Sequence, residues 1–320
     1  MSNTKNILYM VIPCYNEEEV LPETTRRLRD KMHRMMEEGL IDSKSRILYV
    51  DDGSKDKTWE MIEAYHAEGD LVCGAKLSRN RGHQNALLAG LSAAKEYCDM
   101  AISIDADLQD DIEVLDQFVR HYLEGDEVVY GVRSARKKDT FFKRFTAESY
   151  YKMLSCMGVD IVYNHADYRL LSKRAIETLM EYKEVNLFLR GIVPMIGFSS
   201  SEVYYERDKR FAGESKYPLK KMLAFAFDGI TSLSIKPIRF ITTLGTLIFI
   251  VSILLLIHFI IGSVLNRTVP GWATVVISIW ALGGLQLLAI GIIGEYIGKI
   301  YLETKGRPRF IIETLLTEKS

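Results

Sequence analysis

Two carboxylates one residue apart follow a short apolar stretch of this 320-residue chain, in the segment DADLQD at 105–110. The alternating apolar residues before them indicate a buried β-strand, so the acids should emerge at the edge of a sheet. Carboxylate and amide oxygens suit Mg²⁺ or Mn²⁺, and two such ligands leave positions open for a substrate diphosphate. Asp105, Asp107 and Gln109 are therefore candidate metal ligands.

Two further polar segments follow apolar stretches in the same way. The segment DDGS at 51–54 is a tight turn whose carboxylates could accept hydrogen bonds from a base or ribose, although a plain Asp-Gly turn with a helix cap explains it alone. The segment SRNRGHQ at 78–84 is a cationic loop that enters a helix, as phosphate-binding loops do, and a solvated loop would look the same.

Alternating elements must position these segments. Expected strands cover 7–12, 46–50, 72–77, 100–104 and 128–132, and expected helices cover 18–38, 58–68, 84–97 and 112–124. This alternation predicts an α/β fold with a mostly parallel sheet covered on both faces. Ligands of such sheets bind beyond the carboxyl ends of the strands, which is where the polar segments lie.

Composition excludes several classes of protein. With 48% hydrophobic and 26% charged residues the chain is globular, and its net charge of -1 argues against a nucleic-acid partner. Neither G-x-G-x-x-G nor a P-loop occurs, which argues against dinucleotide enzymes and P-loop NTPases. The four cysteines lack C-x-x-C spacing, so buried thiols are expected in place of a zinc site or disulfides.

Membrane-spanning segments are expected near the C-terminus. Residues 241–265 and 272–293 are uncharged and long enough to cross a bilayer, which predicts a two-helix hairpin; a pair of buried core helices is the alternative. Basic residues flank the pair on the outside, so both termini should be cytoplasmic. Residues 217–238 mix lysines with apolar residues at helical spacing, which favours an amphipathic segment on the membrane surface or packed against the soluble domain. The N-terminus shows no signal peptide pattern.

Together these motifs resemble those of the family 2 glycosyltransferases of GT-A fold. The shared segments, in order, are IPCYNEE at 12–18, VDDGS at 50–54, SRNRG at 78–82, DADLQD at 105–110, DYRL at 167–170 and RFAGESKY at 210–217. With the hairpin, the chain is similar over nearly its whole length to the polyprenyl-phosphate group, which includes dolichyl-phosphate mannose synthase and bacterial undecaprenyl-phosphate glucosyltransferases. The resemblance implies a Rossmann-like GT-A domain at 1–216, an amphipathic segment at 217–238, a hairpin at 239–302 and a cytoplasmic tail at 303–320.

The resemblance implies inverting transfer of a sugar from a nucleotide diphosphate to a polyisoprenyl phosphate, at the cytoplasmic face of a bacterial inner membrane. It assigns the metal to Asp107 and Gln109, and Asp105 to the ribose, diphosphate or metal. The implied donor-binding residues are Pro13, Tyr15, Glu17, Asp52, Ser78 and Asn80. Arg81 and His83-Gln84 depart from the usual N-x-G-K pattern, so the donor contacts of the loop at 78–84 stay open. A second departure is Asp111, which stands where proline commonly follows the D-L-Q-D segment.

Charge dictates what else the reaction needs. A phosphate monoester is largely a dianion at neutral pH, so it needs little help from a base but must be brought beside a second anion. Arg133, Arg210 and Lys216 are the candidate cations. Asp167 is a candidate for positioning the sugar or acting as a base, and anchoring Arg169 is an equally good interpretation.

Several alternatives remain open at this point. Glucose from UDP-glucose is the first expectation, with N-acetylglucosamine or mannose next, and uracil is favoured by family analogy alone. A synthase that extends a sugar hydroxyl should carry a Q-x-x-R-W segment, and a nucleotidyltransferase should carry a glycine-rich loop; neither is present. A non-catalytic membrane adaptor that binds a nucleotide-sugar is the alternative from another functional class. Self-association as a homodimer or homotetramer is a further open alternative.

Overall fold

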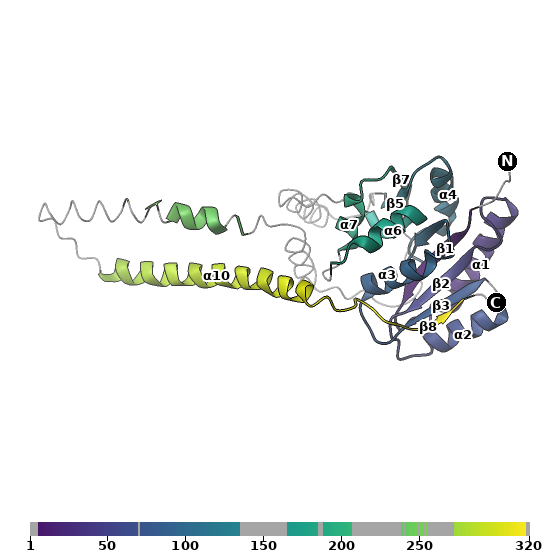
Figure 1. Cartoon of the computed structure of the whole chain (residues 1–320), viewed down its shortest axis with the longest axis horizontal. Coiled ribbons are helices and arrows are strands. Elements are labelled where there is room, and N and C mark those ends of the chain that lie inside the picture. The colour runs from purple at the N-terminus through teal and green to yellow at the C-terminus, as the bar shows by residue number, and fades with distance from the viewer. Residues whose placement is uncertain are drawn as a thin grey trace, which may run out of the picture.

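The computed structural model describes residues 6–69, 71–134, 165–184, 188–206, 238–239, 241–248, 250–251, 254 and 272–317. These residues form one layered α/β domain, from which a long C-terminal helix projects before the chain returns to the sheet (Figure 1). The strands are β1 (Leu8–Cys14), β2 (Arg46–Asp51), β3 (Val72–Leu77), β4 (Met100–Ser103), β5 (Val128–Arg133), β6 (His165–Ser172), β7 (Ser200–Tyr205) and β8 (Ile312–Leu316). The helices are α1 (Leu21–Glu37), α2 (Thr58–Glu68), α3 (His83–Ala94), η1 (Ile112–Val114), α4 (Leu115–Leu123), α6 (Lys173–Glu181), α7 (Leu189–Met195) and α10 (Trp272–Thr304).

The eight described strands form a single sheet in the order β7-β5-β6-β4-β1-β2-β3-β8. The central strands β4, β1, β2 and β3 are parallel, as is the pair β5 and β7, whereas β6 and β8 run antiparallel to their neighbours. The mostly parallel sheet predicted from sequence is therefore confirmed. Its two antiparallel strands were not predicted.

Each face of the sheet is covered by its own set of helices. Alternate residues of β1 point to opposite faces, so Met10 packs with the core under α1, α2 and α4, and Val11 packs with the core under α3, α6 and α7. Helix α3 lies especially close to the sheet, since a Cβ on Gly90 would stand 2.3 Å from a methyl group of Val11. This close contact holds α3 against β1 and β2.

Strand β6 determines which residues face the predicted site. It lies between β4 and β5, antiparallel to both, with Ser103 opposite Arg169. Its amino end therefore lies at the same edge of the sheet as the carboxyl end of β4. This geometry places Asp167 near Asp105, although the two residues are far apart in sequence.

The C-terminal part differs from expectation at two points. Helix α10 continues beyond the predicted span 272–293 and includes Glu295 and Lys299. Its portion Leu282–Thr304 is long and apolar enough to cross a membrane, and it is the one such helix among the described residues. The expected tail 303–320 contains β8, which pairs with β3. Most of 241–265 and nearly all of 217–238 lie outside the described residues, so the hairpin and the amphipathic segment stay predictions.

Candidate active site

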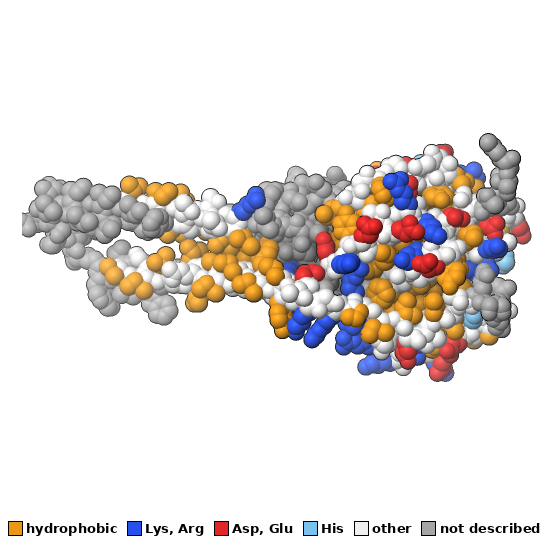
Figure 2. All heavy atoms as spheres, in the orientation of Figure 1, with side chains coloured by type: hydrophobic (Ala, Val, Ile, Leu, Met, Phe, Trp, Pro, Cys, Tyr) orange, Lys and Arg blue, Asp and Glu red, His pale blue; other side chains and the backbone are white. Residues whose placement is uncertain are grey.

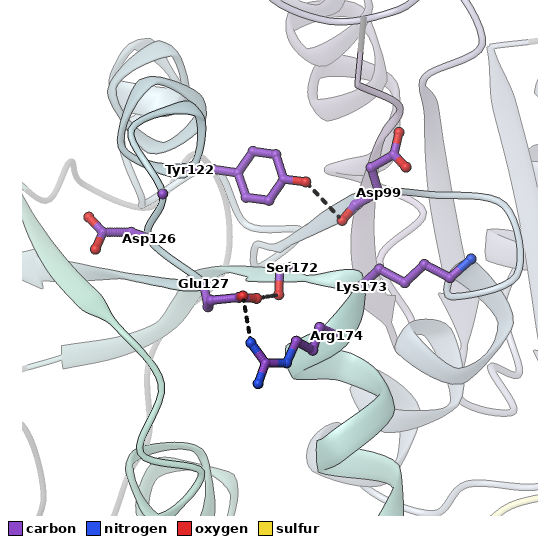
Figure 3. Close-up of a pocket in the computed structure, with 8 residues that line it drawn as sticks. Asp99, Tyr122, Asp126, Glu127, Ser172, Lys173 and Arg174 are labelled. Atoms are coloured by element: carbon purple, nitrogen blue, oxygen red, sulfur yellow. Dashed lines mark hydrogen bonds and ion pairs between the residues drawn. The ribbon is translucent and has the colours of Figure 1, made fainter. Parts of the chain in front are cut away.

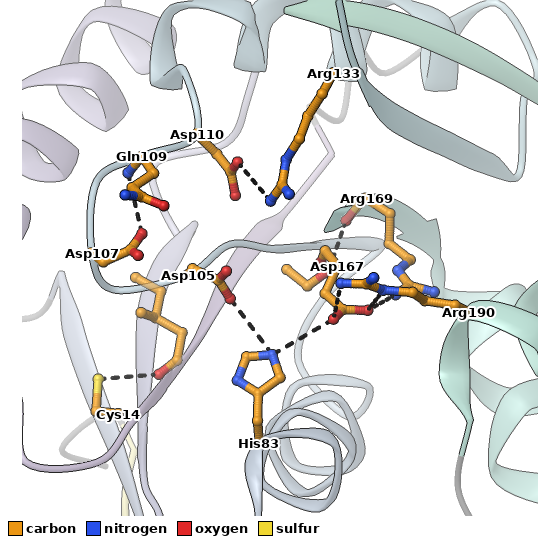
Figure 4. A network of polar contacts seen from close by, with 12 residues as sticks. Cys14, His83, Asp105, Asp107, Gln109, Asp110, Arg133, Asp167, Arg169 and Arg190 are labelled. Carbon is orange, nitrogen blue, oxygen red and sulfur yellow. Dashed lines mark hydrogen bonds and ion pairs between the residues drawn. The ribbon is translucent and has the colours of Figure 1, made fainter. Parts of the chain in front are cut away.

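A cavity of about 570 Å³ opens at the carboxyl edge of the parallel strands (Figure 4). Its lining comes from the loops after β1, β3 and β4, the first turn of α3, the start of β6 and helix α7. The lining residues are Pro13, Glu17, Arg81, Gly82, His83, Gln84, Asn85, Asp105, Ala106, Asp107, Asp167 and Arg190. Acidic and basic groups from distant segments thus converge on one space.

Hydrogen bonds from backbone amides to side-chain hydroxyl groups join the segments that follow β1 and β2. The amide of Asn16 donates to Ser54 Oγ at 3.0 Å, and the amide of Glu17 donates to Thr58 Oγ1 at 2.9 Å. Asn16 itself has a φ of 55°, a left-handed conformation that asparagine tolerates better than most residues. The two loops therefore form one wall, and Glu17 is held where it lines the cavity.

Asp52 holds the loop before α3. One of its carboxylate oxygens accepts from the amide of Arg81 at 2.6 Å, and the other accepts from the amide of Gly82 at 2.8 Å. Burial raises the pKa of Asp52, and these two amide bonds oppose the shift. Gly53 has a φ of 70°, and a Cβ there would stand 2.7 Å from the amide nitrogen of Asn80, so glycine is required for the two loops to meet.

The acidic segment after β4 is tightly held. Thr24 Oγ1 donates to the carbonyl of Ala106 at 2.7 Å, and the amide of Gln109 donates to Asp107 Oδ1 at 3.2 Å. Leu108 between them has a φ of 54°, an uncommon conformation for a residue with a bulky side chain. The Gln109 side chain is buried, while Asp105 and Asp107 are partly exposed at the cavity.

Asp105 and Asp107 are chemically suited to a divalent cation. Burial, together with the carboxylates of Asp110, Asp167 and Asp107, raises the pKa of Asp105, although His83 opposes this shift. The described residues contain no group of three or more His, Cys, Asp or Glu side chains arranged around a metal. Two carboxylates suffice where substrate phosphates complete the shell, which is how Mg²⁺ is usually held in phosphate-transfer sites.

Asp167 is the centre of a cationic cluster. It forms ion pairs with Arg169 and with Arg190, whose Nη2 lies 3.1 Å from Asp167 Oδ2. Burial alone would raise the pKa of Asp167, but Arg190, Arg169 and His83 outweigh it and hold the pKa well below its usual range. A carboxylate so strongly stabilised in its ionised form is a poor proton acceptor, so the geometry favours the anchoring interpretation over the base.

Arg133 is engaged by partners of its own. It lies opposite Tyr205 at the ends of the parallel strands β5 and β7. Its Nε donates to Tyr205 Oη at 3.3 Å, its Nη2 lies 3.5 Å from Asp110 Oδ1, and Tyr205 Oη donates to the same oxygen at 2.6 Å. Arg133 therefore fixes the acidic segment through Asp110, and it does not line the cavity.

The structure brings five predicted site residues into the cavity, namely Pro13, Glu17, Asp105, Asp107 and Asp167. Tyr15 and Asn80 are exposed outside its lining, and the amide of Ser78 donates to the carbonyl of Ile311 at 3.0 Å. Arg210 and Lys216 lie outside the described residues.

Sequence analysis gave the loop 78–84 a possible phosphate-binding role but assigned no individual role to the basic side chains of the cavity, which are Arg81, His83 and Arg190. The departure from the N-x-G-K pattern was a signal for the first two, because it places an arginine and a histidine around the glycine. Arg190 belongs to none of the motifs identified in the sequence. It reaches Asp167 because Gln84 Oε1 accepts from the amide of Leu189 at 3.1 Å, which ties the start of α7 to α3.

A second cavity, of about 340 Å³, lies at the opposite, amino ends of the parallel strands (Figure 3). Glu127 there accepts from Ser172 Oγ and from Arg174 Nη1, and Ser172 Oγ also accepts from the amide of Ala175 as the cap of α6. The amide of Ile7 donates to Asp99 Oδ2 at 2.8 Å. These polar groups are used to hold the ends of neighbouring elements.

Comparison with known proteins decides the family. The sequence profile described as glycosyl transferase family 2 matches residues 9–180, which contain every cavity residue except Arg190. The chain belongs to glycosyl transferase family 2. This glycosyltransferase is 55% identical to an uncharacterized glycosyltransferase of Bacillus subtilis strain 168, YkoT, over 98% of this chain and 93% of that one. It is 38% identical to the bactoprenol glucosyl transferase of Shigella phage SfX, over 95% of this chain and 98% of that one.

Solved structures are also similar to part of this chain. Mannosyl-3-phosphoglycerate synthase from Rubrobacter xylanophilus matches with a TM-score of 0.47 and 17% identity, over 71% of this chain and 72% of that one. The family match and the mostly parallel sheet make the chain an enzyme of the glycosyltransferase class with an α/β GT-A domain.

Proposed function

We propose that this glycosyltransferase transfers glucose from UDP-glucose to undecaprenyl phosphate, with inversion at the anomeric carbon, at the cytoplasmic face of a bacterial inner membrane. The observation that carries the proposal is the cavity at the carboxyl ends of the parallel strands, in which Asp105 and Asp107 face the guanidinium groups of Arg81 and Arg190 and the imidazole of His83. An acidic pair beside two arginines suits a reaction between two phosphorylated substrates.

The choice of acceptor and sugar has separate support. The phage relative is named for glucosyl transfer and for bactoprenol, a polyisoprenyl lipid, and it covers nearly all of both chains. Helix α10 adds a segment apolar enough to enter a bilayer, and apolar side chains cover much of its surface (Figure 2). A membrane-anchored enzyme fits an acceptor whose tail stays in the membrane.

The donor is assigned to the wall built by the loops after β1, β2 and β4. Pro13 and Glu17 would contact the nucleoside, and Asp52 would shape this end by holding the Arg81 and Gly82 amides. Asp105 and Asp107 would hold Mg²⁺ or Mn²⁺. The backbone N–H of Gln109, which donates to Asp107 Oδ1, would orient Asp107. Such an ion, when bound, would neutralise charge on the departing diphosphate.

The basic side chains of the cavity would hold the phosphates. The Arg81 Nε is buried and has no hydrogen-bond partner within the described part of the chain, so a phosphate oxygen would satisfy it. His83 stands at the first turn of α3, with its Nε2 3.5 Å from Asp105 and 3.9 Å from Asp167. Arg190, oriented by Asp167, would bring a second guanidinium group toward the acceptor.

These roles give a direct displacement. The acceptor phosphate is substantially dianionic at neutral pH, so its oxygen can attack the anomeric carbon without a strong base. Asp167 would then keep Arg190 in place and stay ionised, and Arg210 and Lys216 remain proposed acceptor cations. Attack from the face opposite the diphosphate inverts the anomeric configuration.

The test is an assay of the purified chain in detergent with undecaprenyl phosphate, Mg²⁺ or Mn²⁺, and a panel of UDP-, GDP- and dTDP-sugars. Metal-dependent glycolipid from UDP-glucose is the expected product. Glycolipid from an N-acetylglucosamine or mannose donor would correct the sugar only. Tight donor binding without turnover on any donor would favour the adaptor alternative and contradict the proposal.

A further inference from the structure

The helix α10 is joined to the catalytic sheet by a short connection. The helix ends at Thr304, β8 begins at Ile312, and seven residues lie between them. Gly306 has a φ of 54°, and its amide donates to the carbonyl of Glu303 at 3.1 Å, which ends the helix sharply. Seven residues span at most about 25 Å when fully extended, so α10 cannot move far from the sheet.

The connection is also bound to the domain along its length. Arg309 Nη1 donates to the carbonyl of Tyr182 at 2.9 Å, in the segment that follows α6. The carbonyl of Ile311 accepts from the amide of Ser78 at 3.0 Å, and β8 then pairs with β3. Leu316 packs against the core beside Gly74, where an added Cβ would stand 3.2 Å from the leucine methyl group.

One of these contacts reaches the proposed donor site. Ser78 begins the loop that leads to Arg81, Gly82 and His83, all of which line the cavity. The far end of this loop is held by Asp52, and its beginning is held by the Ile311 carbonyl. The segment that leaves the apolar helix therefore also supports the loop proposed to contact the donor phosphates.

We propose that residues 305–316, here named the strap, hold the donor end of the cavity at a fixed distance from the bilayer. This inference rests on the proposed function, because it needs an acceptor that is confined to the membrane. A lipid phosphate cannot rise far above the surface in which its tail is buried. The strap keeps the cavity within its reach by anchoring the sheet to the end of α10.

The test lengthens the strap and leaves its contacts intact. Insertion of Gly-Ser-Gly after Gly306 adds up to about 10 Å upstream of Arg309, Ile311 and β8. Turnover is measured in lipid nanodiscs with undecaprenyl phosphate and, separately, with water-soluble geranyl phosphate. We expect at least a tenfold loss with the membrane-held acceptor and less than a twofold loss with the soluble one. The same insertion after Ser43, in an exposed turn at the opposite end of the strands, should change neither rate.

A pair of single substitutions tests the anchoring contact. Arg309→Gln removes the bond to Tyr182, whereas Arg307→Gln removes the same charge from an exposed neighbour. We expect Arg309→Gln to reduce turnover of the membrane-held acceptor three- to tenfold, with geranyl phosphate turnover unchanged and Arg307→Gln near wild type.

The outcomes are separable. If the lengthened strap keeps its wild-type rate with undecaprenyl phosphate, or loses both acceptors equally, the strap does not set the distance and the inference is wrong. If the wild-type chain uses neither acceptor with any donor, the proposed function itself fails.

Discussion

Each of the two ends of the parallel strands carries a cavity lined by acidic and basic residues. These residues have different roles in the two cavities. At the amino ends, Glu127 accepts hydrogen bonds from Ser172 and Arg174 (Figure 3). Asp99 accepts a hydrogen bond from the backbone amide of Ile7. At the carboxyl ends, Asp105 and Asp107 line the cavity (Figure 4). The buried Nε of Arg81, in the same lining, lacks a partner among the described residues.

The difference teaches that a density of charge does not by itself make a site. Groups whose hydrogen bonds end on caps and strand ends stabilise the fold. Groups held in place by backbone amides, with side chains directed into a cavity, are prepared for a ligand. Substitutions at the carboxyl edge should therefore affect turnover, and those at the opposite edge should affect stability.

The largest loss of turnover is expected at the acidic segment. Asp107→Asn removes a proposed metal ligand and should lower metal-dependent transfer at least about a hundredfold, or about 2.7 kcal/mol in activation free energy. The measurement is glycolipid formation against Mn²⁺ concentration. Asp126→Asn in the opposite cavity is the matched control and should stay within twofold of wild type. Normal turnover of Asp107→Asn would remove the metal role.

Asp167 lines the cavity but also pairs with the buried Arg169, so its substitution can separate a role in catalysis from a role in stability. Asp167→Asn leaves the buried guanidinium of Arg169 without its compensating charge, so unfolding free energy should fall by about 3–5 kcal/mol. The measurement is urea unfolding in detergent. A variant that keeps wild-type stability and loses only turnover would restore the general-base interpretation.

His83 should give a smaller effect confined to catalysis. Its side chain is 43% exposed, so His83→Gln should leave stability unchanged. Loss of a cavity contact should lower kcat/KM for the donor about tenfold. His33→Gln, at an exposed position of α1 outside the cavity lining, serves as the control. Equal kinetics in both variants would take His83 out of the site.

The smallest effect is expected at the opposite edge. Glu127→Gln weakens the bonds to Ser172 and Arg174 and should lower unfolding free energy by about 1 kcal/mol. Turnover should stay within twofold of wild type. A loss of turnover at full stability would show that the cavity in Figure 3 has a role in the reaction.

Much of this comparison could be predicted from sequence, and the missing part has a physical reason. The five expected strands and four expected helices are present because their apolar periodicity is local. The segment at 105–110 was recognisable because its acids follow a buried strand directly. Arg190 and Tyr205 were not, because each acts through a partner far away in sequence that only the sheet order brings near.

The strap shows the same limit. Residues 303–320 have the basic, mixed composition of a tail, and nothing local predicts that Ile312–Leu316 pairs with β3. Arg133 was assigned to the acceptor from its position at a strand end. Its engagement with Asp110 and Tyr205 depends on the neighbouring strand β7, which the alternation of elements did not predict.

The most direct test of the account follows lipid product from UDP-[¹⁴C]glucose and undecaprenyl phosphate for wild type, Asp107→Asn and Glu127→Gln, side by side in proteoliposomes with Mn²⁺. The account predicts labelled glycolipid from wild type and Glu127→Gln, and almost none from Asp107→Asn. Equal product from wild type and Asp107→Asn, or loss of product in Glu127→Gln alone, would contradict it.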